Sequence, residues 1–168
     1  MNHVILIGFM GCGKSSVGKA LAEALLVPFV DTDELIERRN GRLIRDIFRE
    51  SGEDFFRDLE TETLALLLES NERMVIAAGG GLPLRPENRE YIRQLGTAVY
   101  LLATEETLVA RLRQDDTRPL LQGGELEKKI ERLMAEREEI YRETADLQIV
   151  TDGKEIYEIV QEVRKNVG

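Results

Sequence analysis

The strongest constraint on this chain is a glycine-rich segment that follows directly on the apolar run of residues 4–7. The segment, Gly8-Phe9-Met10-Gly11-Cys12-Gly13-Lys14-Ser15, satisfies the pattern G-x-x-x-x-G-K-[ST] at every required position. In such a P-loop, backbone N–H groups converge on the α- and β-phosphates, the lysine reaches the β- and γ-phosphates, and the serine hydroxyl can bind Mg²⁺. The residues that follow are apolar at helical spacing: Val17, Ala20, Leu21, Ala24 and Leu25. The pattern therefore predicts a nucleotide-binding site rather than a glycine-rich turn without a ligand.

Short apolar runs alternate with helical patterns along the whole chain. The predicted strands are residues 4–7, 29–30, 74–78, 98–102 and 147–150, and the main predicted helices are 14–26, 54–69, 86–95, 105–112, 126–142 and 155–163. Strands that are apolar on both faces and separated by helices indicate an α/β three-layer sandwich with a mainly parallel sheet. A length of 168 residues suits a single domain, residues 1–168.

Two stretches break this alternation. Residues 33–73 are longer than a crossover needs, with helical turns expected at 34–39 and 44–50. Part of this insertion, about residues 33–61, is expected to form a flap that holds a second substrate. The polar, glycine-bearing stretch at about 114–125 is expected to form a lid over the phosphates.

The composition of the chain narrows the classes of ligand that it could bind. The net charge of -9 argues against binding to a nucleic-acid backbone, and the 5% aromatic content without Trp argues against a base-stacking surface. One cysteine and one histidine cannot build an internal disulfide or a histidine-based metal cluster, so a metal would need oxygen ligands. With no leader ahead of the first strand and no apolar run near about 18 residues, we expect a cytoplasmic protein without a membrane partner.

Asp31-Thr32-Asp33 follows the second predicted strand. In an extended segment the two carboxylates would share one side while Thr32 faces away, so that one could serve Mg²⁺ and the other an acceptor hydroxyl. Alternatively, Asp33 caps the helix that starts at Glu34. Gly79-Gly80-Gly81, after the third strand, is expected either to let backbone N–H groups approach a ligand or to be a flexible turn.

Three arginines and the cysteine complete the candidates. Arg57 and Arg137, taken singly, are typical of solvent-exposed charges. Arg118 is better placed, because Pro119 stiffens the chain beside it and a closing arginine can neutralise a transferring phosphoryl group. Cys12 lies within the anion-binding loop, which favours a reactive thiolate, although a small residue merely tolerated in the loop is the simpler interpretation.

In order and spacing, these segments together resemble the shikimate kinase family. The segments that carry the resemblance are the P-loop, Asp31-Thr32-Asp33, Gly52-Glu53 through Phe56-Arg57, Gly79-Gly80-Gly81, Arg118-Pro119-Leu120-Leu121, and Arg137 with Tyr141 and Ala145. The resemblance implies a nucleoside monophosphate kinase-like fold, with five parallel strands in the order 2-3-1-4-5. It also implies Mg²⁺-dependent transfer of the ATP γ-phosphate to the 3-hydroxyl of shikimate, which yields shikimate 3-phosphate and ADP for aromatic amino acid biosynthesis.

The resemblance also implies roles for single residues. Shikimate would be bound by Asp33, Arg57, Gly79 and Arg137, and ATP by Gly11, Cys12, Gly13, Lys14, Ser15, Ser16 and Arg118. Lys14, Asp33 and Arg118 would be catalytic, Ser15 would hold Mg²⁺ with Asp31 assisting through water, and Arg111 matches a position near adenine in some members. A monomer is expected.

Two alternatives stay open. One is another small-molecule kinase of this fold, such as a gluconate kinase, whose substrate is also an acid. The other is a nucleotide-dependent switch or binding module without catalysis, although the intact Lys14, Asp33 and Arg118 argue against it. A GTPase is disfavoured because the chain has no N-K-x-D motif.

Overall fold

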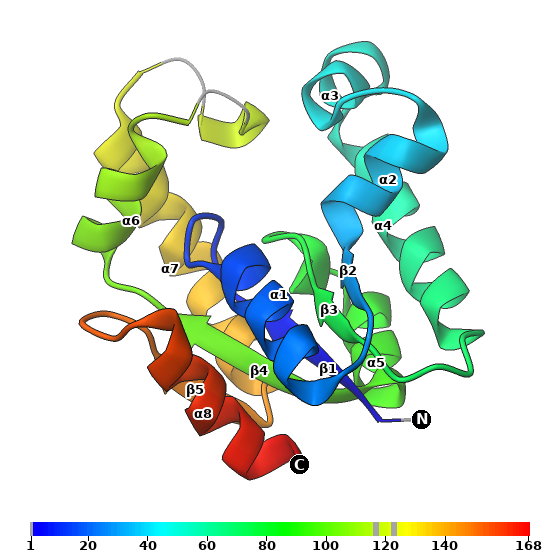
Figure 1. Cartoon of the computed structure of the whole chain (residues 1–168). Helices are drawn as coiled ribbons and strands as arrows, with labels where there is room; N and C mark the ends of the chain where they lie inside the picture. The colour runs from blue at the N-terminus through cyan, green and yellow to red at the C-terminus, as the bar shows by residue number, and fades with distance from the viewer. Residues whose placement is uncertain (1, 116–117, 122–123) are drawn as a thin grey trace.

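The computed structural model describes residues 2–115, 118–121 and 124–168. Five strands form one parallel sheet in the order β2-β3-β1-β4-β5, which confirms the predicted topology (Figure 1). The strands are β1 (His3–Ile7), β2 (Phe29–Asp31), β3 (Val75–Ala77), β4 (Gly96–Leu102) and β5 (Leu147–Val150). In the central register, Ile5 lies opposite Ile76 on one side and Ala98 on the other.

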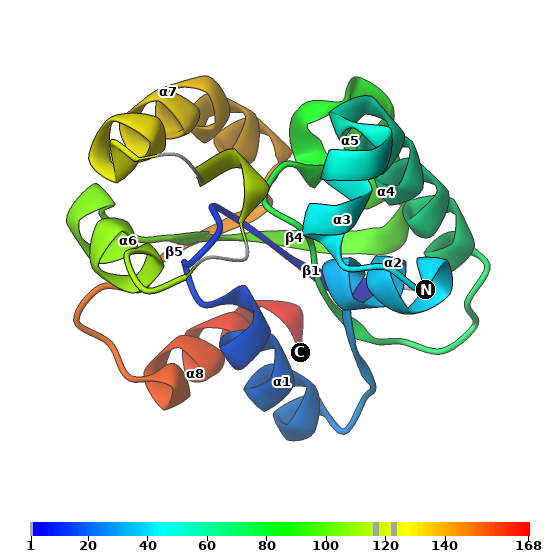
Figure 2. The same ribbon diagram turned by 90° about the horizontal axis from the view of Figure 1, so that it is seen from above.

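Helices cover both faces of this sheet. They are α1 (Lys14–Leu25), α2 (Thr32–Asn40), α3 (Ile44–Ser51), α4 (Glu53–Leu68), α5 (Pro86–Leu95), α6 (Glu105–Leu112), α7 (Leu126–Thr144) and α8 (Ile156–Val167), with short 3-10 turns η1 (Leu82–Leu84) and η2 (Pro119–Leu121). Figure 2 shows α1 and α8 on one side of the sheet and α5 and α7 on the other. The predicted three-layer architecture is therefore confirmed.

The burial of the central strand, β1, explains why its residues form a continuous apolar run in the sequence. All five residues of β1 are buried, because helices cover both faces of a parallel sheet. His3 belongs to this interior, and its Nδ1 accepts a hydrogen bond from the Met74 N–H at 3.2 Å. The imidazole ring therefore satisfies a backbone donor that would otherwise be buried without a partner.

The start of α2 differs from the sequence prediction. Asp31 ends β2, and its Oδ1 accepts hydrogen bonds from the N–H groups of Asp33 (2.9 Å) and Glu34 (3.3 Å). Asp31 is therefore the N-cap, and the alternative that Asp33 caps this helix is wrong. Asp33 lies in the first helical turn, not in an extended segment, because this cap ends the strand two residues earlier.

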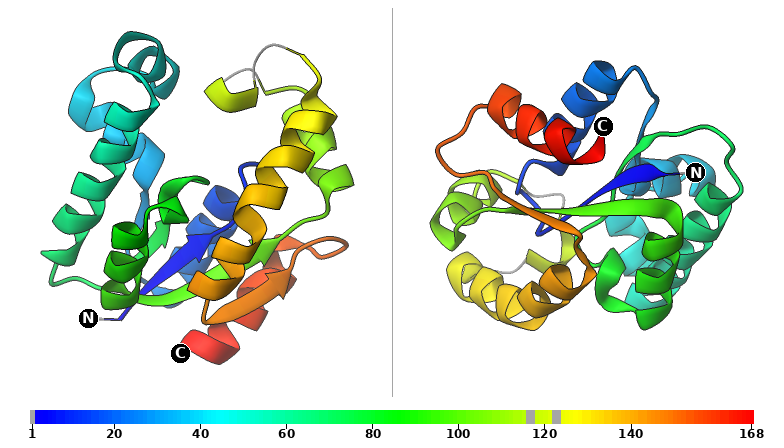
Figure 3. Two further views of the ribbon diagram at one scale, coloured as in Figure 1. Left: turned by 180° about the vertical axis from the view of Figure 1, so that it is seen from behind. Right: turned by 90° about the horizontal axis from the view of Figure 1, so that it is seen from below.

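The insertion and the predicted lid rise on opposite sides of the P-loop (Figure 1; Figure 3, left). Helices α2, α3 and α4 enclose a small apolar cluster of Ile36, Ile47 and Phe56. On the other side, η2 lies within the predicted lid and contacts α3. Residues 116, 117, 122 and 123 of that lid lie outside the described residues. Among the described helices, none is both long and apolar enough to cross a membrane.

Candidate functional site

One cavity of about 790 Å³ opens at the carboxyl ends of the strands. Its lining includes every residue that the sequence singled out for binding or catalysis: Gly11, Cys12, Gly13, Lys14, Ser15, Ser16, Asp31, Asp33, Arg57, Gly79, Arg118 and Arg137. Ligands of open parallel sheets bind at this edge. The fold thus brings together residues that are spread over more than a hundred positions of the sequence.

The P-loop places a positive charge beside the N-terminus of α1. Lys14 Nζ donates hydrogen bonds to the carbonyl oxygens of Gly8 (2.8 Å) and Phe9 (2.9 Å). Gly13 precedes the helix with φ of 98°, a left-handed conformation that favours glycine. The first turn of α1 has no acidic residue and no side-chain cap, so its N–H groups are available to an anion such as a phosphate.

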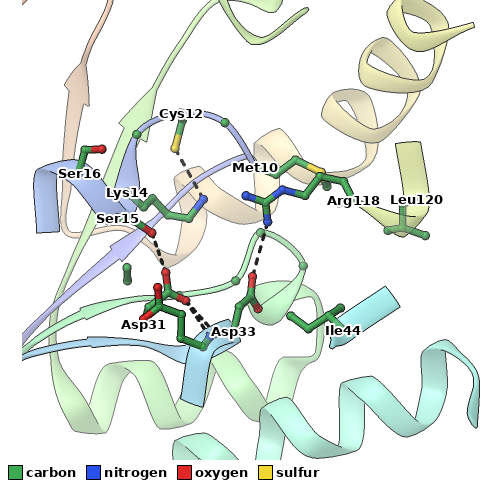
Figure 4. A pocket seen from close by; sticks show the side chains of 18 of the residues that line it. Met10, Cys12, Lys14, Ser15, Ser16, Asp31, Asp33, Ile44, Arg118 and Leu120 are labelled. Carbon is green, nitrogen blue, oxygen red and sulfur yellow. Dashed lines mark hydrogen bonds and ion pairs between the residues drawn. The ribbon is translucent and has the colours of Figure 1, made fainter. Parts of the chain in front are cut away.

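The Cys12 side chain points back into the loop (Figure 4). Its Sγ lies 3.7 Å from Lys14 Nζ, and the residue is only 2% exposed. A bulky thiol reagent could therefore reach the sulfur only if the loop moved. The structure favours the simpler interpretation of Cys12 as a small residue that packs beneath the phosphate loop.

Ser15 and Asp31 form a pair of oxygen donors. The Ser15 hydroxyl donates to Asp31 Oδ2 at 2.6 Å, across the gap between α1 and the end of β2 (Figure 4). Among the described residues, no group of three or more His, Cys, Asp or Glu side chains could hold a metal ion. Mg²⁺ usually takes one or two protein oxygens and completes its shell with water and substrate phosphates, so this pair fits Mg²⁺ bound together with a nucleotide.

Asp33 projects into the same cavity from the first turn of α2. Its Oδ2 lies 3.7 Å from Arg118 Nη1, which comes from the opposite side of the site (Figure 4). Burial, together with the negative charge of Asp31, raises the pKa of Asp33 to about 6, and Arg118 and Lys14 oppose this shift. Such a carboxylate is poised to exchange a proton near neutral pH.

Arg57 and Arg137 are not the solvent-exposed charges that each would suggest alone, since they are 8% and 2% exposed. Arg57 Nη1 donates to Glu60 Oε1 at 2.7 Å, while Nε and Nη1 of Arg137 have no hydrogen-bond partner among the described residues. The Arg137 guanidinium lies over the Phe9 ring, 5.8 Å from its centroid. A buried guanidinium with unsatisfied donors calls for an anionic ligand.

Glu60 is a site residue that the sequence analysis missed. It is 1% exposed, and burial raises its pKa to about 7 although Arg57 opposes the shift. Its Oε2 has no hydrogen-bond partner within the described part of the chain. The signal was available, because a glutamate three residues after Arg57 on one helix lies on the same face.

Gly79 contributes space instead of a backbone donor. Its N–H donates to the Thr32 hydroxyl at 2.9 Å, so the expectation that glycine N–H groups approach a ligand does not hold for Gly79 itself. A Cβ at this position would lie 2.7 Å from Asp33 Oδ1 and 2.9 Å from Glu60 Oε2. Only glycine leaves room for both carboxylates at the end of β3.

The cavity also includes residues that no sequence motif marked. Leu43, Ile44 and Phe48 line it from the region of α3. Thr151, Lys154, Ile156 and Ile159 line it from the end of β5 to α8. Their position after the last strand was the available signal, since all five strands end at this edge. On the same side, Arg111 Nη1 donates to the Gly11 carbonyl at 2.9 Å and braces the P-loop.

Comparisons with known proteins agree with this geometry. A family model described as shikimate kinase matches residues 10–167. A shikimate kinase from Persephonella marina is 45% identical over 163 residues, which cover 97% of each chain. A shikimate kinase from Acinetobacter baumannii, solved in complex with shikimate, superposes with a TM-score of 0.94 at 38% identity and covers 98% of this chain and 92% of its own.

The alternative kinase of the same fold is much more distant. A gluconokinase from Sinorhizobium meliloti superposes with a TM-score of 0.53 at 19% identity, covering 96% of this chain and 88% of its own. This likeness shows the fold alone.

Proposed function

This chain belongs to the shikimate kinase family, and we propose that it transfers the γ-phosphoryl group of ATP to the 3-hydroxyl of shikimate. One observation carries the choice of an acidic acceptor. The Arg137 guanidinium is buried with unsatisfied donors in the cavity that the P-loop also lines. An acceptor that brings a carboxylate there would satisfy those donors and supply a counter-charge, whereas a neutral acceptor would supply no counter-charge.

In this proposal the two arginines bind the acid and Gly79 leaves room for it. Arg57 is already oriented by Glu60, so its guanidinium reaches the acceptor in a fixed geometry. Planar guanidinium groups suit a carboxylate because they can donate two parallel hydrogen bonds. Asp33, on the neighbouring helix, accepts a hydrogen bond from the acceptor hydroxyl and holds its oxygen toward the nucleotide.

The chemical step is an in-line displacement at phosphorus. The acceptor oxygen forms a bond to the γ-phosphorus, the bond from that phosphorus to the bridging β,γ-oxygen breaks, and Asp33 takes the hydroxyl proton. The products are ADP and shikimate 3-phosphate. Because this transition state is loose, positioning and charge neutralisation are the main catalytic contributions.

The chain supplies that neutralisation from two sides. Lys14 lies in the loop that receives the β- and γ-phosphates, and Arg118 approaches from the opposite wall. Gly11, Cys12, Gly13, Ser15 and Ser16 complete the proposed ATP site. When bound, Mg²⁺ would neutralise charge on the phosphate oxygens, and Ser15, with Asp31 through water, would hold it.

We further propose that residues 1–168 act as one domain, in which the insertion (about 33–61) holds the acid and the lid (about 114–125) covers the phosphates. The five-stranded sheet and the cavity that described residues of both segments line support this proposal. Since ATP is the donor, we propose a cytoplasmic enzyme. We also propose that it works as a monomer, because one chain supplies all the residues of the proposed site.

A coupled ADP-release assay with ATP, Mg²⁺ and a panel of hydroxy acids tests the proposal. We expect shikimate-dependent turnover far above the ATPase background and little response to gluconate. Turnover with gluconate but not shikimate would assign the site to the other kinase class. ATP binding without turnover on any acid would favour the binding module.

A further inference from the structure

Asp31 uses its two carboxylate oxygens on different parts of the site. Oδ2 accepts the Ser15 hydroxyl at 2.6 Å, and Oδ1 accepts the N–H groups of Asp33 and Glu34 (Figure 4). Only the first contact belongs to the proposed Mg²⁺ site. The second contact fixes the backbone of Asp33, the residue proposed to hold the acceptor hydroxyl.

We propose that Asp31 is a positioning residue for the acceptor, acting through the N-terminus of α2 and independently of any metal. This inference rests on the proposed function, because it assigns Asp33 to the acceptor side of the site. The inference adds that the geometry of acid binding depends on Asp31, a side chain that also contacts Ser15 in the proposed nucleotide site.

The Asp33 side chain has few other constraints. Among the described residues its carboxylate forms an ion pair with Arg118, at the long distance of 3.7 Å, and the side chain is 24% exposed. Its direction therefore depends mainly on the backbone conformation of the first turn, which the Asp31 cap specifies. Without the cap, the N–H groups of Asp33 and Glu34 would lose their acceptor, and the first turn would fray.

The same turn also positions Gly79, which lines the proposed acceptor site. Thr32, between the two aspartates, is fully buried, and its hydroxyl accepts the Gly79 N–H at 2.9 Å. Gly79 in turn leaves the space in which Asp33 and Glu60 approach each other. Fraying at Thr32 would therefore disturb both the carboxylate and the glycine loop beside it.

Asparagine separates the two functions of Asp31. Asn caps helices about as well as Asp, so Asp31→Asn keeps the acceptor for the first-turn N–H groups, whereas Asp31→Ala removes it. Both variants remove the negative charge that assists Mg²⁺. The charge change also affects Asp33, whose pKa of about 6 is raised partly by Asp31, so binding should be measured near pH 8, where Asp33 is ionised in every variant.

The test is calorimetric titration of shikimate into nucleotide-free protein in EDTA. We expect Asp31→Ala to weaken shikimate binding by about 5- to 10-fold and Asp31→Asn to change it by less than about 2-fold. Hydrogen exchange at the amides of Asp33 and Glu34 should accelerate in the alanine variant only. Both variants should weaken Mg·ADP binding.

Thr104→Ala is the matched control, because Thr104 caps α6 through the Thr107 N–H at 3.3 Å and does not line the cavity. Thr104→Ala should lower the free energy of unfolding by a similar amount without changing shikimate affinity.

Wild-type affinity for shikimate in Asp31→Ala would overturn the inference, and so would an equal loss of affinity in Asp31→Asn. If instead the wild-type protein binds no shikimate, the proposed function fails first. If Asp31→Ala does not fold, slow exchange at the Asp33 and Glu34 amides of folded Asp31→Asn supports the cap, and fast exchange there refutes it.

Discussion

Arg57 and Glu60 form a 2.7 Å hydrogen bond between two side chains that are both buried in the wall of the cavity. The second arginine of the site, Arg137, has no such partner for its Nε and Nη1 within the described part of the chain. The two guanidinium groups proposed to bind the same carboxylate therefore differ before any ligand arrives. Arg57 is held by an internal counter-ion, whereas Arg137 keeps two donors that a bound anion would satisfy.

Replacing either arginine with alanine should weaken shikimate binding while leaving ATP binding nearly intact. The expected loss is about 1.5 to 3 kcal/mol, since each variant removes a charge-assisted hydrogen bond. Calorimetric titration with each ligand measures it, and Arg132→Ala, on the exposed part of α7, is the control. Equal losses for shikimate and ATP would contradict the assignment to the acid.

The two arginines should also differ in their effect on stability. Arg57→Met leaves Glu60 buried without its counter-ion and should lower the free energy of unfolding by about 3 to 5 kcal/mol at pH 8. Arg137→Met removes unsatisfied donors and should cost much less. Urea unfolding of ligand-free protein measures both variants. Similar losses would mean that Arg137 has a structural partner after all.

Lys14→Met should reduce phosphoryl transfer by about 10²-fold or more, because it removes a positive charge from the γ-phosphate site. The fold should persist, since the apolar stem can stay packed in the loop. Turnover and circular dichroism measure the two effects. Lys19→Met, on the exposed face of α1, should behave like wild type. A folded Lys14→Met protein with near-normal turnover would refute the role of the lysine.

Asp33→Asn should lower kcat by about 10² to 10⁴, since the amide cannot take the proton of the acceptor hydroxyl. Wild-type activity should fall as the pH drops through about 6, where Asp33 becomes protonated. A pH-rate profile measures this loss, and turnover of Asp33→Asn close to wild type would contradict it.

The same carboxylate should reduce stability at high pH. Its pKa is raised from 3.8 to about 6, so the folded state binds the proton more tightly than the unfolded chain, and stability is lost as the pH rises through this window. Asp33→Asn should therefore raise the melting temperature at pH 8, and the difference should vanish near pH 4. Lower stability of the variant at pH 8 would show that the carboxylate is held by favourable contacts.

Gly79→Ala should impair shikimate binding through the position of its Cβ. That atom would lie 2.7 Å from Asp33 Oδ1 and 2.9 Å from Glu60 Oε2, which is too close for either carboxylate to stay in place. Alanine is otherwise allowed, because the backbone of Gly79 is not left-handed. We expect a rise in KM for shikimate with little change in KM for ATP. Unchanged KM values would show that the carboxylates can move aside freely.

Much of the fold was predictable because its signals are local. The P-loop has a fixed pattern, the apolar run of residues 4–7 lies in β1, and α5 and α6 have the predicted bounds of 86–95 and 105–112. Helix ends were less certain, as in α7 and α8, which continue beyond the predicted ends at 142 and 163. A fraying terminal turn has little sequence signal of its own.

The site was less predictable where tertiary packing decides which residue caps a helix or whether a side chain is buried. Two aspartates separated by one residue can each cap a helix, and the choice of Asp31 depends on β2 ending there against β3. The burial of Arg57 and Arg137 could not be derived from either residue alone, because it results from α4 and α7 each packing against η1, beside the glycine loop of residues 79–81. The resemblance to a known family assigned both arginines to the acid site. The structure then showed that their hydrogen-bond partners differ.

The cavity at the carboxyl ends of the strands is one space that extends from Phe48 of α3, past Lys14, to Ile159 of α8. Among the described residues, those of the proposed acid site and those of the proposed nucleotide site line this same space. A bisubstrate inhibitor, in which a cyclic hydroxy acid is tethered to an adenosine polyphosphate, could therefore occupy both halves at once. Once one fragment of the inhibitor is bound, the other fragment binds intramolecularly, at an effective concentration of about millimolar for a short tether. The inhibitor should therefore bind more tightly than either fragment alone.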